Sequence, residues 1–294
     1  MLACVVSIKL IVRKTHGGSM KLVKKISMVV ASMAALGALS TANADALDTV
    51  IERGALNCGV VLDFPPMGYT DKDNQPAGFD VDYCNDLAEA LGVKSNVINL
   101  TWADRIPSLI SSKTDVVIGS TSDTLERAKS VGFTYPYFVF KFQVLSKKGV
   151  EIDSFDDLKN VKVGAAIGTT YETEYFKYAD EKGWGRDNYT SFKSENDAFL
   201  GLYQGKIDAL VSTNTNIATK LASGQFDDFV AGPYVPNYDD VVGIIAKRDE
   251  LAWINYLNLF LIHQVRDGKL NDLHVKHFGS PVSEDMVKAL IENR

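Results

Sequence analysis

Apolar and polar residues follow two patterns that alternate along the chain. Apolar runs of strand length cover residues 55–62, 115–119, 161–166 and 208–212. Apolar residues at helical spacing mark residues 80–91, 103–111, 171–181 and 195–204. Strands that alternate with helices build parallel sheets with helices packed on their faces. The pattern therefore predicts an α/β fold.

Two stretches of the chain, residues 109–121 and 202–214, repeat one arrangement. In each, a helix ends, a lysine follows in a turn, and a strand delivers hydroxyl residues at its carboxyl end. Open α/β sheets bind ligands at this end of their strands. If the two units face each other, they form a cleft with Ser120 and Ser122 on one wall and Thr213 on the other. The alternative is a coincidence between two ordinary helix-to-strand turns.

An export signal begins at Met20. Three lysines precede an apolar run, and Ala-Asn-Ala follows at 42–44, which is typical of a signal peptide with its cleavage site. The run is shorter than the roughly 20 residues that span a bilayer as a helix. We predict that residues 20–44 are removed on export to the periplasm, that residues 1–19 reflect an over-long start, and that the mature chain begins at Asp45.

The segment after residue 44 is acidic. The chain has 31 basic and 37 acidic residues, and the first 44 residues hold six of the basic ones and none of the acidic ones. The remainder, with 25 basic and 37 acidic residues, has a formal net charge of −12. Such a charge disfavours nucleic acid and anionic membranes as partners. No membrane-spanning apolar stretch and no cysteine for lipid attachment follows the cleavage site, so we expect a soluble protein. We also expect it to be a monomer.

Two cysteines remain after the predicted cleavage. Cys58 lies in a strand-like run, and Cys84 lies on the inner face of the helix that follows. Such a pair can form a disulfide in an oxidising compartment. Two buried thiols are the alternative.

Arg127 follows the hydroxyl-rich triplet 120–122. A planar guanidinium binds a carboxylate through two parallel hydrogen bonds, and neighbouring hydroxyl and main-chain N–H groups complete the contact. This combination is typical of α-carboxylate recognition. The alternative is a solvated arginine on a helix.

Three further segments offer candidate ligand contacts. Residues 164–172 predict a strand, a turn at Gly168 and a helix start, whose free N–H groups attract an anion unless they are simply capped. Phe64 and Trp102 follow strand ends, where they either sandwich the apolar part of a ligand or belong to the core.

Signals for catalysis are weak. The sequence contains no G-x-S-x-G, H-E-x-x-H, G-x-G-x-x-G or C-x-x-C motif. His274 and His277 could hold a metal only together with acidic residues from elsewhere. We expect neither a cofactor nor a metal.

Several motifs, taken in order, resemble the polar amino-acid family of periplasmic solute-binding proteins (family 3), which includes the histidine, glutamine and glutamate/aspartate receptors. The resemblance covers nearly the whole chain after residue 44. It is carried by residues 78–82, 102–109, 115–133, 135–137, 154–158, 168–170 and 278–279.

The resemblance implies a two-lobed periplasmic binding protein type II fold with the ligand cleft between the lobes. Lobe 1 would comprise residues 45–139 and 241–294, and lobe 2 residues 140–240, with chain crossings near 139–142 and 237–242. Such a protein performs no chemistry of its own. It delivers a small carboxylate-bearing solute, an amino acid or a derivative of one, to the membrane permease subunits of an ABC importer.

The resemblance also implies roles for the candidate residues. Arg127 would clamp the ligand carboxylate from lobe 1, and Thr170 would join it from lobe 2 when the lobes close. Ser120 and Ser122 would hold the amino group and the carboxylate.

Four other positions concern the ligand's side chain and amino group. Phe64 and Trp102 would flank the side chain, and Arg105 matches an arginine that acidic-amino-acid receptors use against a side-chain carboxylate. Thr213 is a departure, because the family has an Asp there that pairs with the ligand's ammonium group. A neutral hydroxyl loses most of that Coulomb attraction. A substituted, cyclic or amine-lacking ligand is therefore an alternative to a free amino acid.

Two other functional classes are compatible with the same resemblance. Cyclohexadienyl dehydratases are exported enzymes of similar fold and need a cleft acid that protonates a leaving hydroxyl. The acids in the matching motifs are Asp63 and Asp104. A sensor input domain is less expected, because no transmembrane segment or signalling domain follows Arg294.

Overall fold

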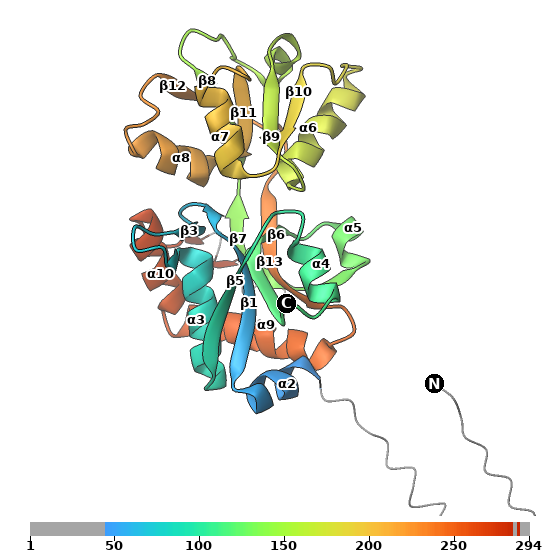
Figure 1. The fold of residues 1–294 in the computed structure, drawn as a ribbon, viewed down its shortest axis with the longest axis vertical. Helices are drawn as coiled ribbons and strands as arrows, with labels where there is room; N and C mark the ends of the chain where they lie inside the picture. The colour runs from blue at the N-terminus through green and yellow to red at the C-terminus, as the bar shows by residue number, and fades with distance from the viewer. Residues whose placement is uncertain (1–44, 285–286, 289–294) are drawn as a thin grey trace, which may run out of the picture. The chain divides into compact units, whose positions relative to one another are not determined.

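The computed structural model of the protein describes residues 45–284 and 287–288. Two five-stranded sheets, one in each of two lobes, organise this part of the chain (Figure 1). The predicted signal peptide and the predicted over-long start lie outside the described residues. Within the described residues, no helix has the length and apolar character needed to cross a membrane.

The first lobe combines the start of the described chain with its end. Its elements are α2 (Ala46–Arg53), β1 (Ala55–Val61), β2 (Asp63–Phe64), β3 (Gly68–Thr70), β4 (Pro76–Ala77), α3 (Phe79–Leu91), β5 (Lys94–Leu100), α4 (Arg105–Ile110), β6 (Val116–Ser122), α5 (Leu125–Ala128), β7 (Val131–Phe140), β13 (Asp240–Lys247), α9 (Leu251–Arg266) and α10 (Lys269–Phe278). The main sheet has the strand order β5-β1-β6-β13-β7, and β2, β3 and β4 form a small separate sheet.

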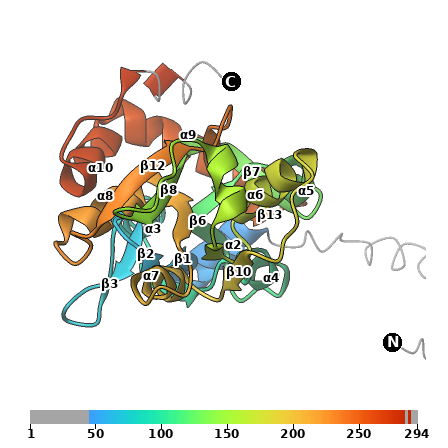
Figure 2. The same ribbon diagram turned by 90° about the horizontal axis from the view of Figure 1, so that it is seen from above.

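The second lobe is built from the stretch between the two crossings. Its elements are β8 (Phe142–Lys147), the 3₁₀ helix η1 (Phe155–Asn160), β9 (Val163–Ala166), α6 (Thr170–Glu181), β10 (Tyr189–Phe192), α7 (Glu195–Tyr203), β11 (Ala209–Thr213), α8 (Asn214–Ala222) and β12 (Phe229–Tyr234). The strand order is β10-β9-β11-β8-β12. Helices α6 and α8 lie on opposite sides of this lobe (Figures 1 and 2).

Local sequence signals determine where the elements begin and end. α2 begins where the Asp45 carboxylate accepts a hydrogen bond from the N–H of Asp48, and it ends where Gly54 adopts the left-handed conformation with φ 68°. The four predicted strands and four predicted helices are confirmed. β6 is longer than expected, and its hydroxyl residues up to Ser122 are buried like its apolar residues.

The two main sheets are mixed rather than parallel throughout. β5, β1 and β6 are parallel, as are β10, β9 and β11. However, β13 runs antiparallel to β6 and β7, and β8 runs antiparallel to β11 and β12. The prediction of parallel sheets was therefore right for the βα units and wrong for the strands next to the crossings. The difference arises because β8 and β13 are the strands with which the chain enters each lobe from the other.

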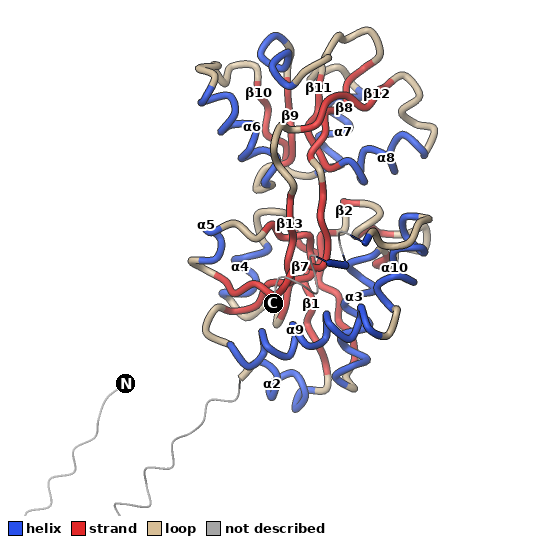
Figure 3. Tube along the Cα trace, turned by 180° about the vertical axis from the view of Figure 1, so that it is seen from behind, coloured by secondary structure: helices blue, strands red, loops and turns tan. Residues whose placement is uncertain are grey.

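Two crossings connect the lobes, near the positions that the sequence predicts. Lys141 separates β7 from β8, and the return segment lies between the end of β12 and the start of β13. The crossings are held together where Asp240 pairs with Phe140 in the β13–β7 ladder (Figure 3). The exact lobe boundaries stay a prediction.

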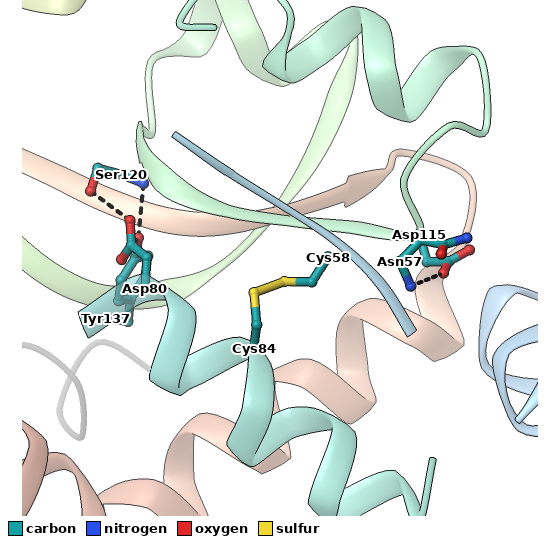
Figure 4. The surroundings of a disulfide bond; sticks show 7 residues. All are labelled: Asn57, Cys58, Asp80, Cys84, Asp115, Ser120 and Tyr137. Carbon is teal, nitrogen blue, oxygen red and sulfur yellow. Dashed lines mark hydrogen bonds between the residues drawn. A yellow bond between two sulfur atoms is a disulfide. The ribbon is translucent and has the colours of Figure 1, made fainter. Parts of the chain in front are cut away.

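Each lobe has its own apolar core. In the first lobe, α9 packs Trp253 into a core that includes residues of β1, α3 and β6. In the second lobe, α6 contributes Tyr175. Cys58 of β1 and Cys84 of α3 form a buried disulfide with a Cα–Cα distance of 6.0 Å, which decides the alternative that the sequence left open (Figure 4).

Candidate functional site

A narrow cavity lies between the lobes, where β6 of the first lobe ends and α6 of the second begins. The cavity is lined by Phe64, Trp102, Arg105, Ser120, Ser122, Phe140, Phe142, Thr169, Thr170, Tyr171, Thr213 and Asp240. Seven of the eight predicted site residues are in this group. The cavity volume is about 10 Å³, which is too small for an amino acid, so in this arrangement the lobes leave no room for a solute of that size.

The eighth predicted residue, Arg127, lies beside the cavity and connects the two lobes. Its Nη1 donates to the carbonyl oxygen of Ser122 at 3.2 Å and to Oγ1 of Thr170 at 3.0 Å. Its Nη2 donates to the carbonyl oxygen of Gly168 at 3.2 Å. Burial lowers the pKa of Arg127, while the negative charge of Asp240 opposes that shift. The guanidinium is thus a cation that donates hydrogen bonds to acceptors of both lobes.

Arg105 begins α4, and its buried guanidinium reaches the end of β6. Its Nη1 donates to the carbonyl oxygens of Gly119 at 2.9 Å and Ser120 at 2.8 Å, and its Nη2 reaches the carbonyl oxygen of Gly168 at 3.3 Å. The guanidinium also lies over the Trp102 ring, 4.8 Å from the ring centre. Burial and the nearby charge of Arg127 lower the pKa of Arg105 to about 9. Most of its N–H groups donate to main-chain carbonyl oxygens, so Arg105 holds the backbone around the cavity in place and also lines the cavity.

Thr170 begins α6 and faces Ser122 across the cleft. The two hydroxyl oxygens are 2.6 Å apart, and the neighbouring Thr169 caps α6 by accepting the N–H of Glu172. Gly168 precedes them with φ 81°, and a Cβ there would lie 3.2 Å from the Ala103 nitrogen of the first lobe. A larger residue at this turn would therefore hold the lobes apart.

The Ser120 side chain is directed into its own lobe. Its hydroxyl donates to Asp80 at 3.0 Å, its N–H donates to the Tyr137 hydroxyl at 2.9 Å, and that hydroxyl donates to Asp80 at 2.9 Å (Figure 4). Burial raises the pKa of Asp80 to about 7, and the hydrogen bonds from Tyr137 and Ser120 oppose the rise. These contacts hold Ser120 at φ 48°, in the left-handed region, so that its carbonyl meets Arg105.

Asp80 and Tyr137 are functional candidates that sequence reasoning missed. Both lie in the motifs that carry the family resemblance, Asp80 in residues 78–82 and Tyr137 in residues 135–137. The signal was present, but nothing in the sequence connects two residues that are 57 positions apart with Ser120.

Asp240 is a third missed residue. It is the first residue of β13, its exposed fraction is 3 %, and it lines the cavity. Burial raises its pKa to about 7, whereas the Ser122 hydroxyl and the charges of Arg127 and Arg105 lower it. Its Oδ1 has no hydrogen-bond partner among the described residues. The sequence drew attention to this segment only as a crossing.

Thr213 caps the helix that follows it. Its Oγ1 accepts the N–H of Asn216 at 3.3 Å and lies 3.2 Å from the Thr215 hydroxyl. The second wall of the cavity therefore offers a hydroxyl group at this position and no charge.

The apolar end of the cavity is aromatic. Phe64 and Trp102 meet edge to face with ring centres 4.9 Å apart, and Phe64 also contacts Phe140 at 5.7 Å. All three side chains are buried. The sequence left open whether Phe64 and Trp102 are core residues or line a ligand site. In the structure they do both, because they belong to the core of the first lobe and also line the cavity.

The C-terminal histidines lie away from this cavity. His277 contacts the Asp82 carboxylate, and His274 Nδ1 lies 2.8 Å from the carbonyl oxygen of Ser280. Across residues 45–284 and 287–288, no three His, Cys, Asp or Glu side chains are placed to hold a metal ion.

Known proteins are similar to this chain in sequence and in fold. Over 260 residues the chain is 31% identical to the L-cystine-binding protein TcyJ of Escherichia coli (strain K12), which covers 87% of this chain and 95% of that protein. An ancestral arginine-binding protein bound to arginine superimposes with a TM-score of 0.72 at 31% identity, covering 77% of this chain and 99% of that one. The ancestral amino acid-binding protein AncCDT-1, a precursor of cyclohexadienyl dehydratase, gives a TM-score of 0.70 at 31% identity and covers 79% and 99%.

These similarities confirm the predicted two-lobed type II fold of periplasmic binding proteins. Residues 56–280, which make up more than half of the chain, match the model of one family. The chain belongs to the bacterial extracellular solute-binding proteins, family 3.

Proposed function

We propose that this protein is the periplasmic substrate-binding component of an ABC importer, and that its solute is an amino acid or an amino-acid derivative that carries a carboxylate. The observation that carries the proposal is the position of Arg127, whose two Nη atoms point at acceptors of both lobes beside the interlobe cavity. A guanidinium with two parallel donors matches a carboxylate. The relatives that bind cystine and arginine support an amino-acid-like solute.

Solute capture works through closure of the lobes. In the open cleft, the guanidinium of Arg127 and the hydroxyl of Ser122 are hydrogen-bond donors on the first lobe. The solute carboxylate then accepts the Arg127 hydrogen bonds that the Gly168 and Thr170 oxygens accept in the present structure. Thr170 then approaches from the second lobe as the crossings bend. Closure expels water, which strengthens each charge-assisted hydrogen bond to the solute.

A second contact between the lobes lies away from the cavity and supports closure as the working motion. Asp63 of the first lobe accepts a hydrogen bond at 2.8 Å from the N–H of Glu195, at the start of α7 in the second lobe. Burial raises the pKa of Asp63, while the N–H groups of α7 lower it. Asp63 is thus occupied as a helix cap in the closed arrangement.

The dehydratase alternative requires a carboxylic acid that donates its proton to a leaving hydroxyl. Asp63 caps α7, and Thr101 donates a hydrogen bond to Asp104 at 2.6 Å outside the cavity lining. The acid that lines the cavity is Asp240, and it lies beside two arginines. Binding without chemistry therefore remains the proposal, and an assay for loss of water from a cyclohexadienol carboxylate tests the alternative directly.

A thermal-shift screen of residues 45–294 tests the proposal. The panel contains the common L-amino acids, L-cystine, opines, betaines and dicarboxylates. A solute present at 100 times its Kd adds about 2.7 kcal/mol to the free energy of unfolding. Scattering on the positive solutes should then show a smaller radius of gyration than an open form. If no carboxylate-bearing compound raises the melting temperature, the proposal is wrong.

A further inference from the structure

Asp240 is a buried carboxylate that has a hydrogen bond from the Ser122 side chain but leaves one oxygen, Oδ1, without a partner among the described residues. Its Oδ1 accepts no hydrogen bond from the described residues, and no Lys, Arg or His nitrogen of that part of the chain lies within 4.0 Å of its oxygens. Carboxylates in protein interiors are normally paired or fully hydrogen-bonded, because an isolated buried charge is costly. A carboxylate that also lines a cavity is therefore placed to receive a partner from the cavity.

The two nearby arginines do not fill that role by contact. Arg105 directs its donors to main-chain carbonyls at the end of β6 and to Gly168, and Arg127 directs its donors to Ser122, Gly168 and Thr170. Both cations are near enough to lower the pKa of Asp240, but neither forms an ion pair with it.

Asp240 lies next to the proposed carboxylate site. Ser122 connects the two, because its carbonyl oxygen accepts from Arg127 Nη1 at 3.2 Å, its side chain hydrogen-bonds Asp240, and both Ser122 and Asp240 line the cavity. An α-amino acid carries its carboxylate and its ammonium on the same carbon atom. It therefore needs a cation and an anion of the protein side by side, which is what Arg127 and Asp240 provide around Ser122.

No other residue of the cavity lining has a negative charge. Thr213, at the opposite wall, is neutral and uses its hydroxyl to cap α8. The acceptor for a cationic group thus comes from a crossing strand of the first sheet rather than from the second lobe.

We propose that Asp240 binds the ammonium group of the solute, and that the solute is an α-amino acid with a free amino group. This inference rests on the proposed function and names its class of solute. It selects the free amino acid from the alternatives that the neutral Thr213 left open.

Nearby ionisable groups and burial determine how Asp240 titrates. Arg127 and Arg105 favour its ionised form, whereas Asp123 disfavours it, and burial raises its pKa to about 7. The phenol of Tyr238 also lies close, since the charge of Asp240 raises the pKa of Tyr238. A bound ammonium would add a positive charge and favour the ionised carboxylate.

The test compares amino acids with their des-amino analogues by calorimetry. The pairs are L-glutamate with glutarate, L-arginine with 5-guanidinovalerate, L-cystine with 3,3′-dithiodipropionate, and any further amino acid from the screen with its own analogue. We expect wild-type protein to bind at least one amino acid about 30-fold or more tightly than its analogue, as for truncation of a buried charge pair. In Asp240→Asn this ratio should fall to about 3-fold or less, because a neutral acceptor contributes much less than a charged one.

Asp239→Asn is the matched control. Asp239 is the preceding residue and makes an exposed ion pair with Lys141 at 3.6 Å, outside the cavity lining. It should keep the wild-type ratio. If Asp240→Asn does not fold, judged by its melting curve, Asp240→Ser replaces it, and the wild-type comparison still stands by itself.

The outcomes separate the two proposals. Equal affinity of wild-type protein for an amino acid and its analogue overturns the role of Asp240 but leaves a carboxylate-binding function intact. A ratio that survives in Asp240→Asn overturns the role as well. If neither the amino acids nor any other carboxylate binds, the proposed function fails, and the inference fails with it.

Discussion

Removal of the Arg127 side chain tests the centre of the proposed site. In the structure its guanidinium donates three hydrogen bonds, two of them to Thr170 and Gly168 of the second lobe. With solute bound, we expect a carboxylate to accept these donors in a cleft that excludes water. Arg127→Ala leaves that carboxylate desolvated and without its cation.

The expected loss is large, because the charge that remains stays buried. Truncating one partner of a buried, hydrogen-bonded charge pair costs about 2 to 5 kcal/mol. At about 1.4 kcal/mol per decade, affinity should fall by roughly 30-fold to several thousand-fold. Arg127→Lys should recover only part of the loss, since an ammonium group lacks the planar pair of donors.

Calorimetry with the solute from the screen measures the effect. Arg248→Ala is the control, because Arg248 also donates to a main-chain oxygen, that of Lys129 at 2.9 Å, but it lies outside the cavity lining. This control should change affinity less than 2-fold and stability by about 0.5 kcal/mol or less. Near-wild-type affinity of a folded Arg127→Ala protein would show that the carboxylate binds elsewhere and refute the reasoning.

Three further predictions concern the lobes, the disulfide and pH. Thr170→Val removes the hydroxyl that now contacts Arg127 and Ser122 and that we expect to contact the solute carboxylate when the lobes close, so it should weaken solute binding by about 10-fold in calorimetry, whereas Thr173→Val, one turn along α6, should leave it unchanged. Reduction of the Cys58–Cys84 bond, which spans a sequence separation of 26, should lower the free energy of unfolding by about 3.5 kcal/mol in urea titrations with and without reductant; equal midpoints would contradict this. Because the pKa of Asp240 is raised to about 7 and its ionised form binds an ammonium, affinity should rise about 10-fold from pH 6 to pH 8. Calorimetry at pH 7 in buffers of different ionisation enthalpy should then show net proton release, and a proton uptake or a flat profile would count against the Asp240 assignment.

The sequence alone determined the elements whose signals are local. Helical spacing predicted α6 and α7 closely, and an apolar run predicted β1, because these patterns depend on neighbours within a few residues. The repeated helix-to-strand pattern also predicted that Ser122 and Thr213 line one cavity, since each ends a strand at the carboxyl edge of its own sheet, where open α/β sheets place ligands.

The tertiary structure decided what depends on contacts between distant segments. β13 inserts antiparallel between β6 and β7 and pairs Val242 with Ser122, which brings Asp240, two residues earlier, within hydrogen-bonding reach of the Ser122 side chain although 118 positions separate them. No local pattern encodes such a pairing, so the sequence indicated only a crossing there. The same reason applies to Asp80, whose hydrogen bond from Ser120 is formed only when α3 packs against β6. It applies equally to Cys58 and Cys84, which could remain thiols until β1 and α3 bring them together. Periodicity specifies the faces of helices and strands, whereas the partners of a buried charge are set by packing.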